Sequence, residues 1–162
     1  ALCKAIGATK KGTIEGNIDD ETYLDLMTEL GILPLIYKVF AEAFRLEVEM
    51  GHSEEAVLTE AYLSREMAFL WEQAAERGLF RQLCLHSHTA QYAQLKRFGE
   101  ADGQMIRGFL KEAYESIRSG AFNQEWKDEQ KVYKLAHLDE LREKALHTDV
   151  TKAEDRLKER LK

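Results

Sequence analysis

The sequence predicts an all-α protein. Alanine, leucine, glutamate, lysine, glutamine and arginine dominate its 162 residues, and these residues have the highest helix propensity. Only one proline, Pro34, interrupts the chain, and no long stretch shows the alternating Val, Ile and Thr pattern of strands. The apolar content of 44% is sufficient for the core of a single domain. We therefore expect one helical domain over residues 1–162.

The first long helix is predicted over residues 20–49, after a loop or short helical end at 1–18. Apolar side chains recur there at three- and four-residue steps, which marks a buried stripe. Pro34 lies within it and removes one helical hydrogen bond, so a kink is expected near residues 30–34. Three residues can cap the helix by accepting its free amide protons: Asn17, Asp19 and Asp20.

A second helix is predicted over residues 53–77, capped by Ser53 and closed by Gly78. Its apolar residues lie on more than one side, which predicts either deep burial or a partner on the second face. Residues 79–101 show a less regular pattern, with a polar run at 86–89 that reads as a break between helices.

The C-terminal part predicts a series of shorter helices. Their ranges are 104–119, about 122–131, 135–146, and a last charged helix ending at Lys162. Thr151 and Glu154 have the spacing of a capping box for this last helix.

Charge and hydropathy exclude two classes of partner. The net charge of -6 argues against a nucleic-acid binder, which needs a basic face. No apolar run approaches the roughly 20 residues needed to span a bilayer.

Cys3 and Cys84 lack the spacing of a redox or metal motif, which suggests reduced thiols in the cytoplasm. The N-terminus has neither an initiator Met nor a signal peptide, which fits either a truncated chain or a natural stand-alone domain.

The candidate functional groups are carboxylates that lie one helical turn apart. Asp25 and Glu29 share one face of the first helix and could bind a hard divalent cation such as Mg²⁺. A solvated acidic face is the simpler reading, although like charges one turn apart are destabilising without a cation. In the second helix Glu60 and Ser64 share a face, whereas Glu66 lies well round from Glu60. His86 and His88, around Ser87, are either exposed loop residues or groups for metal binding or acid–base work.

Several stretches, taken in order, resemble the C-terminal helical domain of the ketol-acid reductoisomerases. They cover nearly the whole chain and lie at residues 5–9 with 12–15, 21–29, 48–55, 87–92 and 110–126. Residues 48–55 resemble the start of the family's second helix, and residues 87–92 resemble its Ser-x-Thr-Ala-x-Tyr loop.

The resemblance implies roles for individual residues. Asp25 and Glu29 would be ligands of two Mg²⁺ ions, and Ser87 would hydrogen-bond the substrate carboxylate. The family's second helix carries two carboxylates one turn apart, and ungapped counting from Gly51 places them at Glu60 and Ser64. A small gap would instead bring Tyr62 and Glu66 into register.

The resemblance also implies the activity and the partners. The enzyme family moves an alkyl group in a 2-acetolactate-like 2-hydroxy-3-keto acid and reduces the product with NAD(P)H, in branched-chain amino acid biosynthesis. The cofactor would sit on an N-terminal Rossmann domain absent from residues 1–162, so the isolated chain is expected to be inactive. The family fold is a knotted homodimer with interleaved helices. Because Thr28, Leu30 and Ser64 depart from the family pattern, the alternative is a helical dimerisation module without catalytic activity.

Overall fold

The computed structural model describes residues 2–5, 7, 12, 14 and 16–161, and every regular element among them is helical. The all-α prediction is therefore confirmed. The family-like stretches at 5–9 and 12–15 lie partly outside the described residues, as does the side chain of Cys3, whereas Cys84 is an exposed free thiol. No helix of the described chain is both long enough and apolar enough to cross a membrane.

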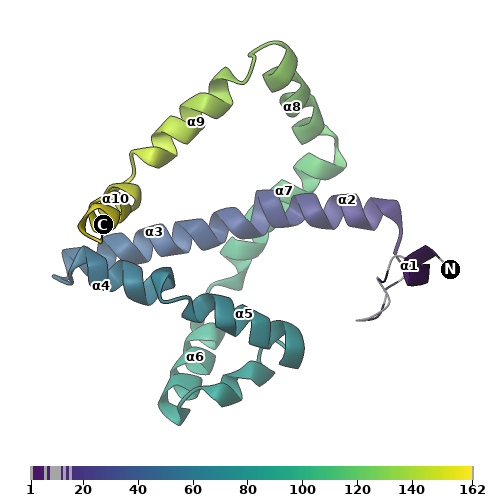
Figure 1. Cartoon of the computed structure of the whole chain (residues 1–162). Coiled ribbons are helices and arrows are strands. Elements are labelled where there is room, and N and C mark those ends of the chain that lie inside the picture. The colour runs from purple at the N-terminus through teal and green to yellow at the C-terminus, as the bar shows by residue number, and fades with distance from the viewer. Residues whose placement is uncertain (1, 6, 8–11, 13, 15, 162) are drawn as a thin grey trace.

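Ten α-helices and three irregular helical turns follow one another along the described chain (Figure 1). The α-helices are α1 (Leu2–Ala5), α2 (Ile18–Met27), α3 (Leu33–Glu49), α4 (Glu54–Leu58), α5 (Glu66–Arg77), α6 (His88–Glu100), α7 (Gly103–Arg118), α8 (Ala121–Lys131), α9 (Ala136–Leu146) and α10 (Asp149–Arg160). The irregular turns are the π-helical η2 (Thr28–Ile32) and η3 (Thr59–Leu63) and the 3₁₀-helical η4 (Arg81–Leu85).

The first long helix is confirmed, and it consists of α2, η2 and α3 placed end to end (Figure 1). Asn17 is the cap, since its side-chain oxygen accepts from the Asp20 N–H at 2.7 Å. The irregularity expected near Pro34 takes the form of the π-helical turn, in which the Leu33 N–H reaches back to the Thr28 carbonyl. A wider turn leaves room for the proline ring, which would otherwise crowd the carbonyl one turn earlier.

The predicted continuous helix over residues 53–77 is wrong. Ser53 does cap α4, but the helix widens into η3 and then breaks at Arg65, whose φ of 63° lies in the left-handed region. The Ser64 hydroxyl accepts from the Glu66 N–H at 3.3 Å, so a local side-chain bond replaces the helical one there. Helix α5 begins after this break, beyond a short link that is visible in Figure 1.

One expectation is met in part and another is corrected. The break expected within the polar run at 86–89 lies at His86 and Ser87, between η4 and α6, whereas His88 and Thr89 already belong to the first turn of α6, which Ser87 caps. The last helix starts at Asp149 with Thr148 as its cap, three residues before the predicted Thr151. The helices predicted over 104–119, 122–131 and 135–146 correspond to α7, α8 and α9.

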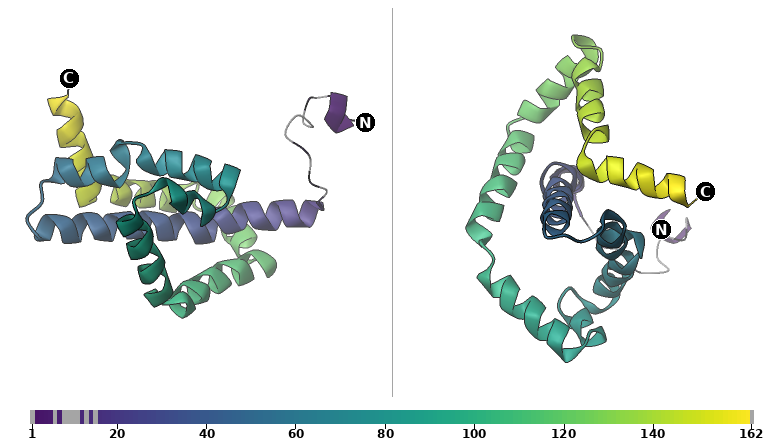
Figure 2. Two further views of the ribbon diagram at one scale, coloured as in Figure 1. Left: turned by 90° about the horizontal axis from the view of Figure 1, so that it is seen from below. Right: turned by 90° about the vertical axis from the view of Figure 1, so that its left-hand side faces the viewer.

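The chain closes on itself where α10 returns to the long helix (Figure 2). The buried residues at this junction come from α3, α4 and α10, and they are Phe44, Val57, Leu58 and Ala153. Val48, Tyr62, Val150 and Leu157 pack around them. This small core joins the C-terminal helix to the segment that carries Glu60.

A second contact holds α7 against η2. Gly31 is buried there, and a Cβ on it would lie 2.8 Å from the Met27 Cε and 2.9 Å from the Leu110 Cδ2. The Tyr23 ring of α2 and the Tyr114 ring of α7 also pack against each other, with centroids 6.1 Å apart. A side chain at position 31 would force Met27 and Leu110 to shift, so the glycine favours the close approach of α7 to the turn that contains Glu29.

The arrangement leaves an open framework, in which α8 and α9 arch away from the long helix between α7 and α10, which both contact it (Figure 2). The chain exposes 13397 Å², whereas a compact monomer of its 18.7 kDa would expose about 8,300 Å². Large apolar side chains are among the exposed residues on most helices, Phe69 and Trp71 of α5 included. Helix α5 is therefore not deeply buried within this chain, and its second face is open.

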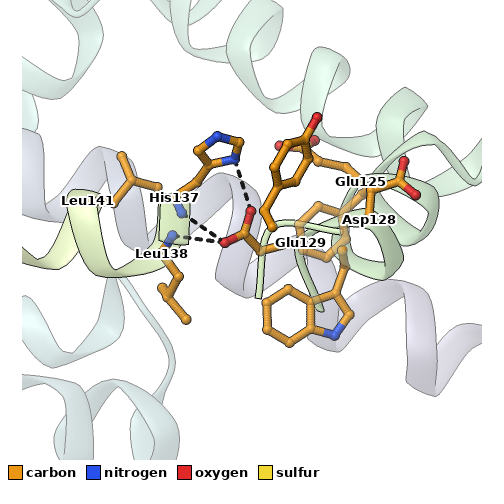
Figure 3. Close-up of a pocket in the computed structure, with 9 residues that line it drawn as sticks. Glu125, Asp128, Glu129, His137, Leu138 and Leu141 are labelled. Atoms are coloured by element: carbon orange, nitrogen blue, oxygen red, sulfur yellow. Dashed lines mark hydrogen bonds and ion pairs between the residues drawn. The ribbon is translucent and has the colours of Figure 1, made fainter. Parts of the chain in front are cut away.

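The corner between α8 and α9 depends on a buried carboxylate (Figure 3). Glu129 is 9% exposed, and its Oε1 accepts from the backbone N–H groups of His137 at 3.0 Å and Leu138 at 3.1 Å. Its Oε2 lies 3.0 Å from the His137 Nδ1. Lys134 and Leu135 both have positive φ in this turn, and the N-cap Leu135 has no capping side chain. Glu129 therefore caps α9 from the preceding helix.

Glu129→Ala is expected to lower the free energy of unfolding by about 1–3 kcal/mol, because two partly buried backbone N–H groups lose their charged acceptor. Glu125→Ala is the matched control, since Glu125 lies one turn earlier on α8 and is exposed; a surface change of this kind should stay within about 0.5 kcal/mol. Urea unfolding at fixed protein concentration measures both. Equal effects of the two variants would contradict the capping role.

Candidate functional site

The first pair of candidate ligands lies on the long helix. Asp25 belongs to α2 and Glu29 to η2, and both side chains are exposed. Within the described residues neither carboxylate forms an ion pair with a basic side chain. Their charges are thus available to a cation, and Gly31 and α7 keep the backbone under them in place.

The second group lines a cavity of about 480 Å³ between α5, η4 and α6. Glu60 from η3 and Glu66 from the start of α5 both border it, and Ser64 is not among its lining residues. Counting along a regular helix had put Glu66 well round from Glu60. The break at Arg65 reorients α5 and brings the two carboxylates to the same cavity.

The rest of the cavity wall is apolar on one side and polar on the other. The apolar residues are Met67, Leu70, Trp71, Ala74, Leu79 and Ala90, and the polar ones are Gln82, His86 and Gln94. Gln82 is buried, donates to the Leu79 carbonyl at 3.3 Å and lies 3.3 Å from the His86 Nε2. Sequence reasoning missed Gln82; its position one turn before His86 was the available signal.

Ser87 follows directly after His86 and is the N-cap of α6. Its Oγ accepts from the Ala90 N–H at 3.2 Å, which leaves the hydroxyl proton free to be donated. The Gln91 side chain donates to the His86 carbonyl at 2.8 Å and fixes the backbone at this point. An exposed hydroxyl donor at a helix N-terminus suits a carboxylate.

Tyr62 lies in η3, two residues from Glu60, and its hydroxyl donates to the Glu154 carboxylate of α10. The pKa of Tyr62 is raised well above its ordinary value by burial, and further by the hydrogen bond to Glu154 and by that negative charge. Tyr62 therefore remains a neutral donor across the physiological pH range.

The two groups of carboxylates remain separate within one chain. Asp25 and Glu29 do not border the cavity that Glu60 and Glu66 line. Among the described residues no three His, Cys, Asp or Glu side chains gather closely enough to hold a metal ion. One chain therefore presents two separate groups of candidate ligands, each of which contains a residue of a π-helical turn, a feature often found at functional sites.

Comparison with known proteins agrees with the resemblance seen in the sequence. Residues 18–162 match the family described as "Ketol-acid reductoisomerase, C-terminal domain". The chain is 34% identical over 165 residues to the putative ketol-acid reductoisomerase 3 of Saccharolobus solfataricus, covering 97% of this chain and 47% of that protein. It is 35% identical over 138 residues to the ketol-acid reductoisomerase (NADP(+)) of Pyrobaculum aerophilum, covering 80% of this chain and 39% of that protein.

A solved structure gives the same answer for the fold. The NADH-preferring ketol-acid reductoisomerase from an uncultured archean superposes with a TM-score of 0.82 at 27% identity, over 98% of this chain and 47% of that one. The chain thus spans about half the length of the relatives it matches. It belongs to the family of ketol-acid reductoisomerase C-terminal domains.

Proposed function

We propose that this chain is the metal- and substrate-binding part of a ketol-acid reductoisomerase. The observation that carries the proposal is the placement of Glu60 and Glu66 on one cavity, which also borders His86, the residue before Ser87, in a member of this family. The complete enzyme would convert a 2-acetolactate-like 2-hydroxy-3-keto acid by an alkyl shift followed by reduction. The nicotinamide would be bound by a Rossmann domain outside residues 1–162. Relatives are named for NADP(+), for NAD(P)(+) and as NADH-preferring, which supports NAD(P)H as the reductant.

The donor atoms present suit Mg²⁺, which takes carboxylate oxygens and retains several waters. Asp25, Glu29, Glu60 and Glu66 supply such oxygens, with Ser64 as the other candidate for the last position. When bound, Mg²⁺ polarises ketone and hydroxyl oxygens as a Lewis acid. The Ser87 hydroxyl would hold the substrate carboxylate, and the apolar cavity wall of Met67, Leu70 and Trp71 would exclude water from the reacting carbons.

A second copy of the chain would complete this site. Each chain exposes about 5,000 Å² more than a compact monomer would, so two chains together have more excess surface than the roughly 2,000–5,000 Å² that many obligate homodimers bury in total. A homodimer in which Asp25 and Glu29 of one chain face the cavity of the other would join the two partial ligand sets. The interleaved and knotted packing implied by the family resemblance remains part of this proposal.

Mn²⁺ binding, followed by electron paramagnetic resonance and competed with Mg²⁺, tests the ligand assignment. Glu60→Gln and Glu66→Gln are each expected to weaken Mn²⁺ affinity by at least about tenfold, because each removes a charged donor. Glu72→Gln is the control, since Glu72 is exposed on α5 and is not part of the cavity wall. An affinity unchanged by Glu60→Gln would sink the proposal. A loss with Ser64→Ala but not with Glu66→Gln would assign the last position to Ser64.

Assays of the isolated domain and of its fusion to a Rossmann domain distinguish an enzyme from a dimerisation module without activity. The domain on its own should show no substrate-dependent NADPH consumption, whereas its fusion to a family Rossmann domain should. A fused protein that binds no Mn²⁺ and turns over nothing would favour the module.

A further inference from the structure

The C-terminal helix reaches the cation-binding segment through one hydrogen bond. The Tyr62 hydroxyl donates to the Glu154 carboxylate, across 92 positions of the chain. Tyr62 lies inside η3 together with Glu60, and Glu154 lies on α10, next to the buried Ala153. This contact ties the last helix to the turn that holds a proposed ligand.

Other links from α10 reach a different part of the chain. Arg156 donates to both carboxylate oxygens of Glu54, at 2.7 Å from Nη2 to Oε1 and 2.6 Å from Nη2 to Oε2, and Arg160 pairs with Glu55. Glu54 and Glu55 form the first turn of α4, ahead of η3. These exposed ion pairs hold the start of α4, so the Tyr62–Glu154 bond acts separately on the π-helical turn.

The π-helical form of η3 acts together with the break at Arg65 to determine how Glu60 and Glu66 are aligned. The turn is closed by the Ser64 N–H bonded to the Thr59 carbonyl at 3.0 Å, five residues back. Such wide turns are rare and depend on their surroundings. If η3 relaxed into an α-turn, the residues after it would rotate by about 100° relative to those before it. That rotation would move Glu60 and Glu66 off their common cavity.

We propose that Tyr62 and Glu154 are positioning residues of the cation site, holding η3 in its π-helical form so that Glu60 and Glu66 border one cavity. The inference rests on the proposed function, which assigns a cation to these carboxylates. The Tyr62 ring is placed independently of its hydroxyl, because it packs edge-on against Phe40 with centroids 6.0 Å apart. Tyr62→Phe therefore removes the hydrogen bond and keeps the packing.

Mn²⁺ affinity and the urea unfolding midpoint, measured together on the same protein, test the inference. Tyr62→Phe is expected to weaken Mn²⁺ affinity about tenfold, in line with the loss of a hydrogen bond to a charged acceptor. Glu154→Leu should weaken it equally, and Glu154→Gln should restore it to within about twofold, since the amide oxygen still accepts. The double variant Tyr62→Phe/Glu154→Leu should lose no more Mn²⁺ affinity than either single variant.

Arg156→Gln is the control for a merely structural effect. It breaks the Glu54 pair on the same helix and should leave Mn²⁺ affinity unchanged, whatever it does to the unfolding midpoint. Equal losses of affinity in Arg156→Gln and Tyr62→Phe, or no loss in Tyr62→Phe, would overturn the inference. Glu60→Gln, measured in the same way, distinguishes a failure of the positioning role from a failure of the proposed function. If it weakens Mn²⁺ binding while Tyr62→Phe does not, only the positioning role fails; if Glu60→Gln has no effect, the proposed function fails and the inference with it.

Discussion

Asp25→Asn is expected to reduce turnover by about 10³-fold or more in a protein that joins this domain to a Rossmann domain. The carboxylate is exposed on α2, and no described basic side chain neutralises it. Loss of a metal ligand removes Lewis-acid stabilisation that is worth several kcal/mol in the transition state. Glu29→Gln should behave in the same way. Steady-state kinetics at saturating Mg²⁺ measures the effect.

Glu21→Gln serves as the control for Asp25→Asn. Glu21 is exposed in the first turn of the same helix, four residues before Asp25, and has no assigned role. Its replacement should leave kcat within about twofold, since surface substitutions have small effects. Comparable losses from Glu21→Gln and Asp25→Asn would point to the general acidity of the helix rather than to a ligand pair.

Phe69→Glu is expected to weaken self-association by about 100-fold or more. Phe69 is 50% exposed on the open face of α5. On a solvated surface this change would cost about 0.5 kcal/mol or less, whereas an unpaired carboxylate within a dimer interface costs several kcal/mol. Sedimentation equilibrium over a range of protein concentrations gives the dissociation constant.

The control for Phe69→Glu is Glu72→Gln on the same helix. Glu72 is exposed and already polar, so its replacement should leave the dissociation constant unchanged. If Phe69→Glu also leaves it unchanged, α5 does not contribute its open face to the interface.

Local patterns predicted much of the fold because they act within a few residues. The apolar period of the long helix, the Asn17 cap and Gly78, whose φ is positive, all specify local backbone geometry. The same reasoning failed at Thr151, because Thr148 offers an equally good cap three residues earlier. Apolar periodicity is a stronger signal for the existence of a helix than for the position of its first residue.

The site was harder to predict because it depends on a break that no strong signal announces. Arg65 adopts a left-handed conformation that is uncommon for any residue with a side chain. A regular helix through this point separates Glu60 from Glu66, whereas the break brings both to one cavity. Gln82 was not predicted either, because it borders the cavity only through the packing of η4 and α6 beside α5. The candidate residues could be named from the sequence, but their grouping depends on tertiary structure.

The central claim is that one chain holds two partial ligand sets and that a second chain completes each site. Co-purified mixtures of an Asp25→Asn chain with a Glu60→Gln chain, both joined to a Rossmann domain, test it most directly. Each variant alone should be inactive. If ligands come from both chains, half of the randomly mixed dimers contain one intact site, so turnover should return to about a quarter of the wild-type value. If each site is built within one chain, every site lacks a ligand, and a mixture as inactive as its two parents would contradict the account.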